Sequence, residues 1–183
     1  MVKHIHITGA SGSGTTTLGQ KISEEYGLEH FDSDDYFWQP TDPPYQKRRP
    51  IKKRQKLLFR DIKEADGWVI SGSLCTWGDI FTKYFDLVIF LWVPTEIRIK
   101  RLKRRERKKF GSDVLPGGDM FAGHQQFINW ASKYDRGDLK MRSKLKHELW
   151  LKKLDCPVLR IEGEYELEES FSMVEEKIKE LRA

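Results

Sequence analysis

Short apolar runs alternate with longer amphipathic segments along the whole chain. Five apolar runs are expected to form strands, and they lie at residues 2–7, 28–38, 67–73, 86–93 and 156–161. Helical periodicity marks residues 16–27, 50–65, 94–110, 121–135, 138–154 and 166–183. Nearly continuous apolar runs are typical of parallel strands with both faces buried. The pattern therefore predicts an α/β fold, a three-layer sandwich with a five-stranded, mostly parallel sheet.

The composition is that of a globular protein. The chain of 183 residues has no internal repeat or long linker, so we expect one domain over residues 1–183. No apolar run reaches the roughly 18 residues needed to cross a bilayer. No secretory h-region precedes the first strand, and the two cysteines, Cys75 and Cys156, lie far apart in the sequence. We therefore expect a cytoplasmic protein with reduced thiols and no membrane partner.

Basic residues are concentrated in two segments. Residues 47–60 hold eight Lys/Arg and no acid, and residues 98–109 hold nine Lys/Arg and one Glu. Because the net charge of the whole chain is only +5, the remainder of the chain is acidic. This asymmetry predicts a local anionic ligand, since a general polyanion-binding protein is more often basic throughout.

A Gly/Ser-rich loop separates the first expected strand from the first expected helix. Its sequence GASGSGTT, residues 9–16, matches the pattern G-x-x-x-x-G-K-[ST] at every fixed position except Thr15, which replaces the lysine. The glycines allow main-chain N–H groups to surround a phosphate, and the helix directs the positive end of its dipole to the same place. Thr16 occupies the position whose hydroxyl binds Mg²⁺. The residues expected to bind phosphate are Gly9, Ser11, Gly12, Ser13, Gly14, Thr15, Thr16 and Thr17, and the alternative is a turn that binds nothing.

Three acids occur near the end of the second expected strand. If that strand alternates, Asp32 and Asp34 share one face, and Asp35 follows them. Ligands of parallel α/β sheets bind at the carboxyl ends of the strands, so these acids and the Gly/Ser loop should meet at one cleft. The alternatives are a solvated loop or the N-cap of a following turn. Trp38 belongs to an aromatic group in the same segment, expected either to stack on a ring of the ligand or to pack against the core.

Four stretches in order, GASGSGTTTL, HFDSDDYFW, VISGS and LWVPTEIRIKRLKRRE, resemble the P-loop nucleoside/nucleotide kinase superfamily, which includes adenylate, shikimate and uridine kinases. Over nearly the whole chain, the sequence is similar to adenylate-kinase-related bacterial proteins of the "topology modulation" type. The resemblance implies a P-loop NTPase fold of the nucleoside monophosphate kinase type with a small helical lid. It places an acceptor-binding helical segment at residues 36–66 and a lid-like insertion at residues 101–140.

The resemblance also implies a reaction. The protein would transfer the γ-phosphoryl group of ATP, with Mg²⁺, to a small acceptor such as a nucleoside monophosphate or a nucleoside. Asp34 and Asp35 would orient or deprotonate the acceptor, and the lid residues Arg101 and Arg105 would supply the charge that Thr15 lacks. The acceptor-binding residues would be Asp32, Trp38, Arg48, Arg54 and Gly72, with Arg136 and Arg142 contributing from the segment that returns from the lid.

A basic helix next to a loop without lysine also fits a different class of protein. A nucleotide-sensing regulator that acts on DNA, with little or no kinase turnover, would use that helix to bind nucleic acid. Nucleotide turnover that is abolished by a change at Asp34 would favour the enzyme.

None of the histidines has a Cys, His or Asp partner at metal-ligand spacing, so no zinc site is expected. A monomer and a homodimer both remain open.

Overall fold

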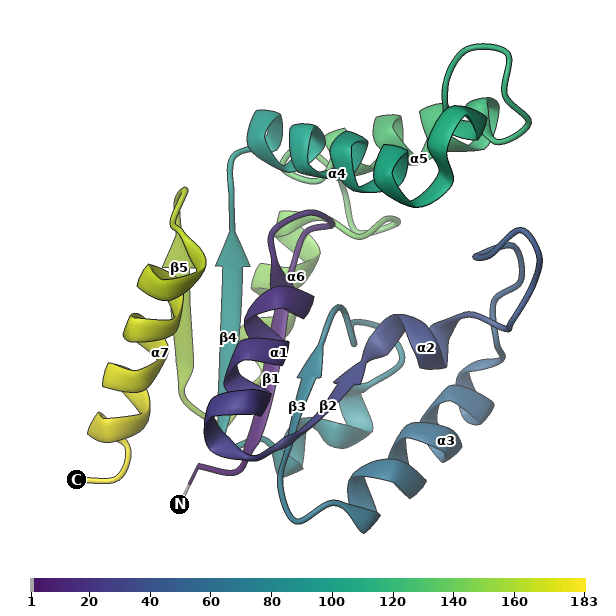
Figure 1. The fold of residues 1–183 in the computed structure, drawn as a ribbon. Coiled ribbons are helices and arrows are strands. Elements are labelled where there is room, and N and C mark those ends of the chain that lie inside the picture. Colours follow the sequence, from purple (N-terminus) through teal and green to yellow (C-terminus); the bar gives the residue numbers. More distant parts are fainter. Residues whose placement is uncertain (1) are drawn as a thin grey trace.

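A sheet of five parallel strands forms the centre of the computed structural model, which describes residues 2–183 (Figure 1). The strand order is β2-β3-β1-β4-β5, and every neighbouring pair is parallel. In the register of the central strands, Ile5 pairs with Val69 on one side and with Leu87 on the other. The predicted α/β fold is confirmed. The strands are β1 (His4–Gly9), β2 (Glu29–Asp32), β3 (Trp68–Ser71), β4 (Leu87–Trp92) and β5 (Val158–Glu162).

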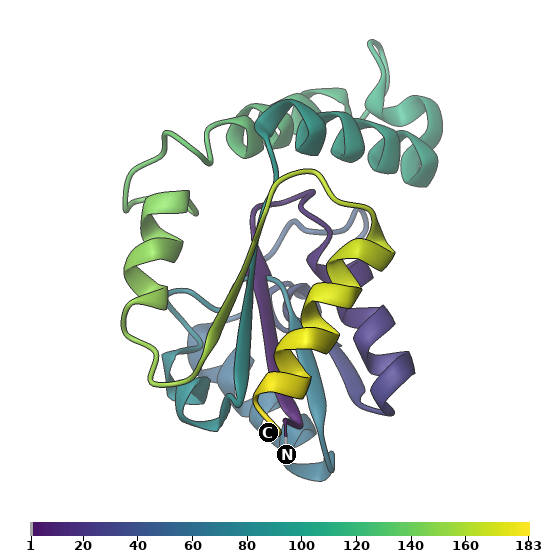
Figure 2. The ribbon, with the colours of Figure 1, turned by 90° about the vertical axis from the view of Figure 1, so that its left-hand side faces the viewer.

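Helices cover both faces of this sheet, which gives the three layers (Figure 2). One face packs against α1 (Thr15–Tyr26) and α7 (Leu167–Glu180), through buried residues such as Leu18 and Val174. The other face packs against α3 (Ile51–Glu64), the 3-10 helix η1 (Asp79–Tyr84) and α6 (Lys144–Leu151). Because both faces are covered, β3 is buried at every position, which explains its continuous apolar run.

A helical arm lies across the carboxyl ends of the strands (Figure 1). It consists of α4 (Thr95–Phe110), the 3-10 helix η2 (Gly111–Val114) and α5 (Phe121–Ser132), and it is called the α4–α5 arm below. The two long helices pack on each other through Leu102 of α4 and Ile128 of α5. The arm overlaps the segment predicted as a lid, residues 101–140, but it begins earlier. Among the helices of residues 2–183, none has the length and apolar character needed to span a membrane.

Two predicted boundaries are wrong, and an N-cap explains each. The second strand ends at Asp32, whose side chain accepts a hydrogen bond from the main-chain N of Asp34 at 2.9 Å and thereby starts the helix α2 (Ser33–Phe37). Asp34 therefore lies on a helix and does not share a strand face with Asp32. Similarly, α6 does not begin near residue 138, because the Ser143 side chain caps it by accepting from the N of Lys146 at 3.1 Å.

Candidate functional site

The Gly/Ser loop follows β1 and ends at the first turn of α1. Gly12 and Gly14 have φ values of 82° and 96°, in the region that favours glycine. A Cβ at Gly12 would lie 2.8 Å from the main-chain oxygen of Arg98, so the arm leaves no room for a side chain there. The first N–H groups of α1 have no partner within the helix. The loop therefore presents main-chain donors at a helix N-terminus, which is the arrangement that binds phosphate.

Thr16 joins this loop to the acids that follow β2. Its Oγ1 donates to Oδ2 of Asp32 at 2.9 Å. A hydroxyl beside a carboxylate fits Mg²⁺, which prefers hard oxygen ligands and retains several waters next to substrate phosphates. Residues 2–183 contain no cluster of three or more His, Cys, Asp or Glu side chains suited to a metal ion. An ion bound here would therefore take its remaining ligands from water and from the substrate.

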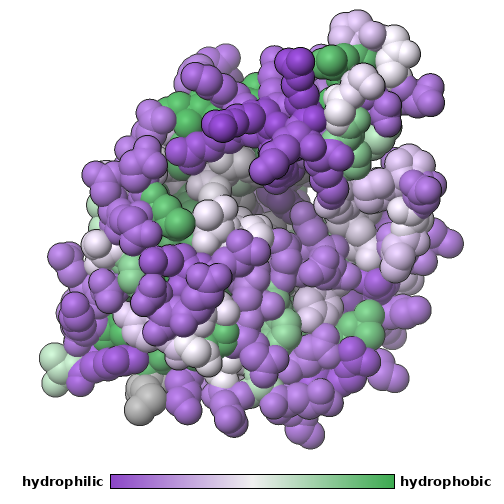
Figure 3. Space-filling model, viewed as in Figure 1, coloured by the Kyte–Doolittle hydropathy of each residue, from purple (hydrophilic) through white to green (hydrophobic). Residues whose placement is uncertain are grey.

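Asp34 and Asp35 lie in the first turn of α2 and face different surroundings. The molecular surface is hollowed beneath the α4–α5 arm (Figure 3). Asp34 is an exposed residue, but nearby protein limits the hydration of its carboxyl group. This desolvation raises the pKa of Asp34, while the charges of Arg142 and Arg105 act to lower it. Desolvation also raises the pKa of Asp35, next to Asp32. Asp34 is therefore the acid whose pKa is lowered by arginines of the α4–α5 arm and of the segment that follows it.

The predicted arginines of the arm and of the returning segment are not equivalent. Arg105 is exposed and forms an ion pair with Glu106 at 2.9 Å, and the Arg142 guanidinium lies 5.6 Å from the centre of the Trp130 ring. Both act on Asp34. Within the described chain, Arg101 and Arg136 make no side-chain hydrogen bond or ion pair. Of these four arginines, Arg105 and Arg142 are the ones whose charges lower the pKa of Asp34.

Arg98 has a role that its place in a basic segment does not reveal. Its side chain is fully buried, and its Nη1 donates to the main-chain oxygens of Ser11 and Ala131, both at 3.3 Å. Its Nη2 lies 3.4 Å from Asp135, whose carboxylate also accepts from Trp92 Nε1 at 2.8 Å. Arg98 thus attaches the base of the arm to the phosphate loop. Helical spacing alone, which groups Arg98 with Arg101 and Arg105, could not indicate this anchoring.

Arg54, on α3, is a buried cation whose side chain pairs with no acid among the described residues. It is 7% exposed, and its guanidinium lies 3.8 Å from the centre of the Phe37 ring. Desolvation lowers its pKa, and the neighbouring charges of Arg48 and Arg49 lower it further. Arg49 is bound to the protein itself, because its Nη1 donates to the main-chain oxygens of Asp35 and Tyr36 in α2. A desolvated guanidinium without a carboxylate partner is suited to bind an anion.

The remaining predicted acceptor residues border the same region. Trp38 packs edge-on against Phe37 at 4.9 Å and against Tyr45 at 6.0 Å, and the exposed Arg48 lies 5.9 Å from its ring. Gly72 has φ 99°, and a Cβ there would lie 2.1 Å from Ser33 Oγ. Only glycine therefore allows the end of β3 to approach the start of α2 so closely.

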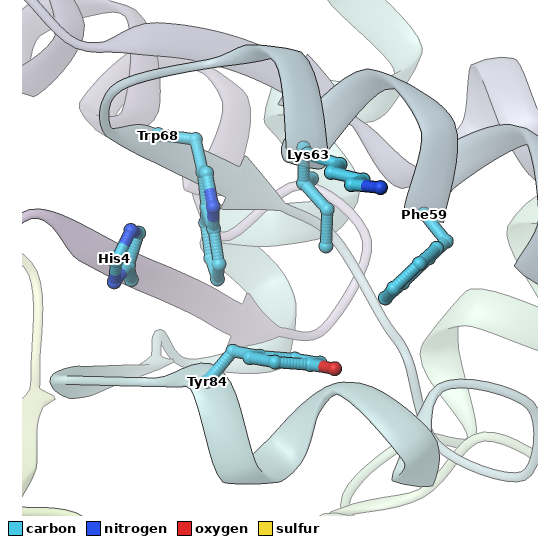
Figure 4. Close-up of a pocket in the computed structure, with 6 residues that line it drawn as sticks. His4, Phe59, Lys63, Trp68 and Tyr84 are labelled. Atoms are coloured by element: carbon cyan, nitrogen blue, oxygen red, sulfur yellow. The ribbon is translucent and has the colours of Figure 1, made fainter.

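The pocket shown in Figure 4 lies elsewhere, at the amino ends of β1 and β3. It has a volume of about 200 Å³, and aromatic rings make up most of its wall. It has no acid in its lining and lies at the sheet edge opposite to the Gly/Ser loop, so it is not part of the candidate site. Its lining residues are His4, Phe59, Ile62, Lys63, Trp68 and Tyr84.

Comparison with known proteins identifies relatives of this chain. A family model described as an AAA domain matches residues 5–114. The uncharacterized protein YqaC of Bacillus subtilis (strain 168) is 43% identical over 174 residues, which cover 95% of this chain and 96% of YqaC. A cytidylate kinase of Pyrococcus horikoshii is 33% identical over 112 residues, or 56% of this chain and 57% of that enzyme. A shikimate kinase from Acinetobacter baumannii, solved with shikimate, has a TM-score of 0.59 at 18% identity and covers 98% of this chain and 94% of that kinase.

A glycine loop between the first strand and helix of a parallel sheet, with acids at the end of the second strand, defines a P-loop protein of the nucleoside/nucleotide kinase type. The chain spans just over half the length of the cytidylate kinase that it matches. The chain belongs to the AAA-domain family, as a kinase-like nucleotide-binding protein. The resemblance inferred from the sequence is confirmed.

Proposed function

We propose that the protein transfers the γ-phosphoryl group of ATP to a small acceptor, with nucleoside monophosphates and nucleosides as the first candidates. The observation that carries this proposal is the hydrogen bond from Thr16 to Asp32. It joins a phosphate-binding loop to a cluster of acids at the carboxyl edge of the sheet, where such folds bind ligands. Asp34, two residues further on, is close enough to Arg142 and Arg105 for their charges to lower its pKa.

The donor would bind to main-chain groups. The N–H groups of residues 9–16 and the start of α1 would hold the polyphosphate. Thr16 and Asp32 would hold Mg²⁺, directly or through water, and the bound ion would offset charge on the phosphates. Thr15 is neutral and too short to reach the outer phosphates. Arg105 and Arg142 would supply positive charge in place of the lysine, because both already act on Asp34.

The transfer itself asks little of the protein beyond positioning and charge. An oxygen of the acceptor forms a bond to the γ-phosphorus as the bond to the β,γ-bridging oxygen breaks, and ADP leaves. When the acceptor oxygen is a hydroxyl, its proton passes to the carboxylate of Asp34. A carboxyl group with a raised pKa is the better base for this step near neutral pH, provided that it is still ionised.

The acceptor would carry an anionic group, because the buried Arg54 side chain would otherwise have no acid to pair with. A guanidinium that is desolvated against Phe37 and lacks a carboxylate partner in the described chain would gain most from a phosphate or carboxylate of a ligand. Arg48 lies beside it and is exposed. This charge favours a nucleoside monophosphate over an uncharged nucleoside.

The test is to incubate the protein with Mg·ATP and a panel of nucleoside monophosphates, nucleosides and polyols, and to identify phosphorylated products by chromatography. We expect product with at least one nucleoside monophosphate. Arg54→Lys keeps the charge but loses the planar fork, so KM for that acceptor should rise at least about tenfold. Lys56→Ala, on the exposed face of the same helix, is the matched control and should leave KM unchanged. Binding of ATP without product from any acceptor would refute the transfer.

Asp34→Asn separates the two acceptor classes. The attacking oxygen of a nucleoside monophosphate is already largely ionised at neutral pH, since the second pKa of such a phosphate is about 6. With that acceptor, the variant should mainly alter KM. With a nucleoside hydroxyl, loss of the base should lower kcat by about 100-fold or more.

The outer surface of α4 favours a second candidate function, a nucleotide-sensing regulator that binds DNA. Lys100, Lys103, Arg104 and Lys108 are exposed, and none of them forms an ion pair within residues 2–183. A transferred phosphoryl group does not require so many unpaired charges. Retention on duplex DNA with a steep salt dependence, lost when these four residues are replaced together, would support this function. Equal retention of the fourfold variant would exclude it.

A further inference from the structure

We propose that His147 is a positioning residue that couples the phosphate loop to the acceptor side of the site, through a buried series of hydrogen bonds and one cation–π contact. The inference rests on the proposed function, because it assumes that nucleotide binds at the phosphate loop. Its basis is a set of contacts between segments that lie far apart in the sequence, which link the phosphate loop at one end to the helix of Arg54 at the other.

The centre of the series is an imidazole held between two hydroxyl groups. Tyr134 OH lies 2.7 Å from His147 Nδ1, and Ser73 Oγ lies 3.0 Å from His147 Nε2. All three residues are buried, with exposed fractions of 2%, 0% and 6% for Tyr134, His147 and Ser73. Both ring nitrogens thus have a partner in a region closed to solvent, where loss of either bond leaves a buried polar group unsatisfied.

From Tyr134 the series continues to the phosphate loop through Arg98. The Arg98 guanidinium lies 5.2 Å from the centre of the Tyr134 ring and donates to the carbonyl oxygen of Ser11 in the loop. It also donates to Ala131 at the end of the arm. A shift of the Ser11 carbonyl therefore moves a cation that rests on the tyrosine ring.

From Ser73 the series continues to the acceptor side. The main-chain oxygen of Ser73 accepts from Trp77 Nε1 at 3.1 Å, and the oxygen of Trp77 accepts from Gln55 Nε2 at 2.7 Å. Gln55 follows Arg54 on α3, and the Arg54 guanidinium lies 5.9 Å from the Trp77 ring. Residues 72–78, called the β3 loop here, are thus tied at one end to His147 and at the other to the helix that carries the anion-binding arginine.

The β3 loop needs this support because its backbone is strained. Thr76 has φ 76°, and a β-branched residue in this region is a conformational outlier. Such a conformation persists only where surrounding contacts enforce it. The hydrogen bonds of Ser73 and Trp77 are those contacts. Loosening the series at His147 should therefore loosen the loop.

The neutral imidazole of His147 has one donor and one acceptor nitrogen, so both of its hydroxyl partners are needed to satisfy it. Burial raises the pKa of the Tyr134 phenol although the charge of Arg98 acts in the opposite direction, so Tyr134 keeps its O–H. One of the two hydroxyl groups, Tyr134 OH or Ser73 Oγ, therefore donates to the ring and the other accepts from it. Ordering of one end by a ligand is thus carried to the other through buried groups that each need their partner.

Hydrogen–deuterium exchange measured by mass spectrometry, with and without Mg²⁺ and the non-hydrolysable analogue AMP-PNP, tests the coupling. In the wild type, we expect the nucleotide to slow exchange in residues 9–16 and also, by roughly threefold or more, in the β3 loop. Tyr134→Phe and Ser73→Ala each remove one hydroxyl group. Both variants should keep the slowing in residues 9–16 and lose it in the β3 loop.

Tyr36→Phe is the matched control, since it removes a different hydroxyl hydrogen bond, the one that Tyr36 donates to Asp61 at 2.9 Å. It should retain the effect at both places. Slowing of the β3 loop that persists in Tyr134→Phe and Ser73→Ala, or is missing from a wild type that does respond in residues 9–16, would overturn the coupling alone. If AMP-PNP leaves residues 9–16 of the wild type unchanged, the proposed function fails, and the coupling fails with it.

Discussion

Mild acid should destabilise this protein strongly, because two histidines are buried in their neutral form. His6 is fully buried, and burial lowers its pKa to about 4, although a hydrogen bond to the Ile70 carbonyl acts in the opposite direction. Burial, with the charge of Arg142, lowers the pKa of His147 to about 3. In the unfolded chain both groups titrate near about 6.5. As the pH falls below this value, both histidines are therefore protonated in the unfolded state but remain neutral in the native state.

The magnitude follows from proton linkage. Between about pH 7.5 and about pH 5, protonation stabilises the unfolded state by about 2 kcal/mol for each histidine. His6 and His147 together should thus lower the free energy of unfolding by about 4 kcal/mol, a large part of the 5–15 kcal/mol of a typical domain. The result depends little on the native pKa values, since both imidazoles are still neutral at about pH 5 in the folded protein. The stability is fully present above about pH 6.5 and is lost as the pH falls.

Other titratable groups change how steeply the free energy of unfolding falls with pH, but they do not reverse its direction. His30 is partly buried and its pKa is lowered by desolvation, so it adds to the loss. The raised pKa values of Asp34 and Asp35 act in the opposite direction, because these carboxyl groups bind protons more readily in the native state. Both acids are exposed residues, so their effect is reduced by solvent.

Urea unfolding, followed by tryptophan fluorescence at several pH values, measures this loss directly. His6→Phe keeps a ring against Phe85, 5.1 Å away in the wild type, and removes the buried Nε2, which has no hydrogen-bond partner in residues 2–183. The variant should show about half of the wild-type loss, or about 2 kcal/mol. A wild-type loss below about 1 kcal/mol, or an equal loss in His6→Phe, would refute the assignment of the effect to buried histidines.

Three further predictions concern the site. Gly12→Ala places a Cβ 2.8 Å from the Arg98 carbonyl at a φ of 82°, so stability should fall by about 1–2 kcal/mol and ATP affinity should decrease, as calorimetry can show. Arg142→Gln removes the strongest charge that lowers the pKa of Asp34, so the acid limb of kcat/KM should move to higher pH; an unmoved limb would mean that Asp34 is not the titrating group. Asp135→Ala leaves the buried Arg98 without its carboxylate and should cost about 3 kcal/mol in a denaturant titration, whereas a loss under about 1 kcal/mol would contradict the anchoring.

Local chemistry explains why much of the fold and the phosphate loop could be predicted. A continuous apolar run indicates a buried parallel strand wherever it occurs, and the spacing of glycines in residues 9–16 matters to the backbone of that segment alone. At Asp32 the structure has the alternative interpretation of the acids, the N-cap of a following turn. Aspartate is a preferred N-cap, and a second acid, Asp35, follows three residues later.

The chain by itself determined the order of strands and helices, the phosphate-binding turn and the acids beside it, because these depend on neighbours a few residues away. Only the tertiary structure decided how the basic residues differ: Arg98 is buried against the loop, Arg54 is buried against Phe37 without an acid partner, and Arg101 remains unpaired within residues 2–183. It also brought His147 to Ser73, 74 residues away in the sequence. Helical periodicity specifies the face on which a side chain lies, but what packs against that face depends on contacts between distant segments, and a pattern of residue types does not record them.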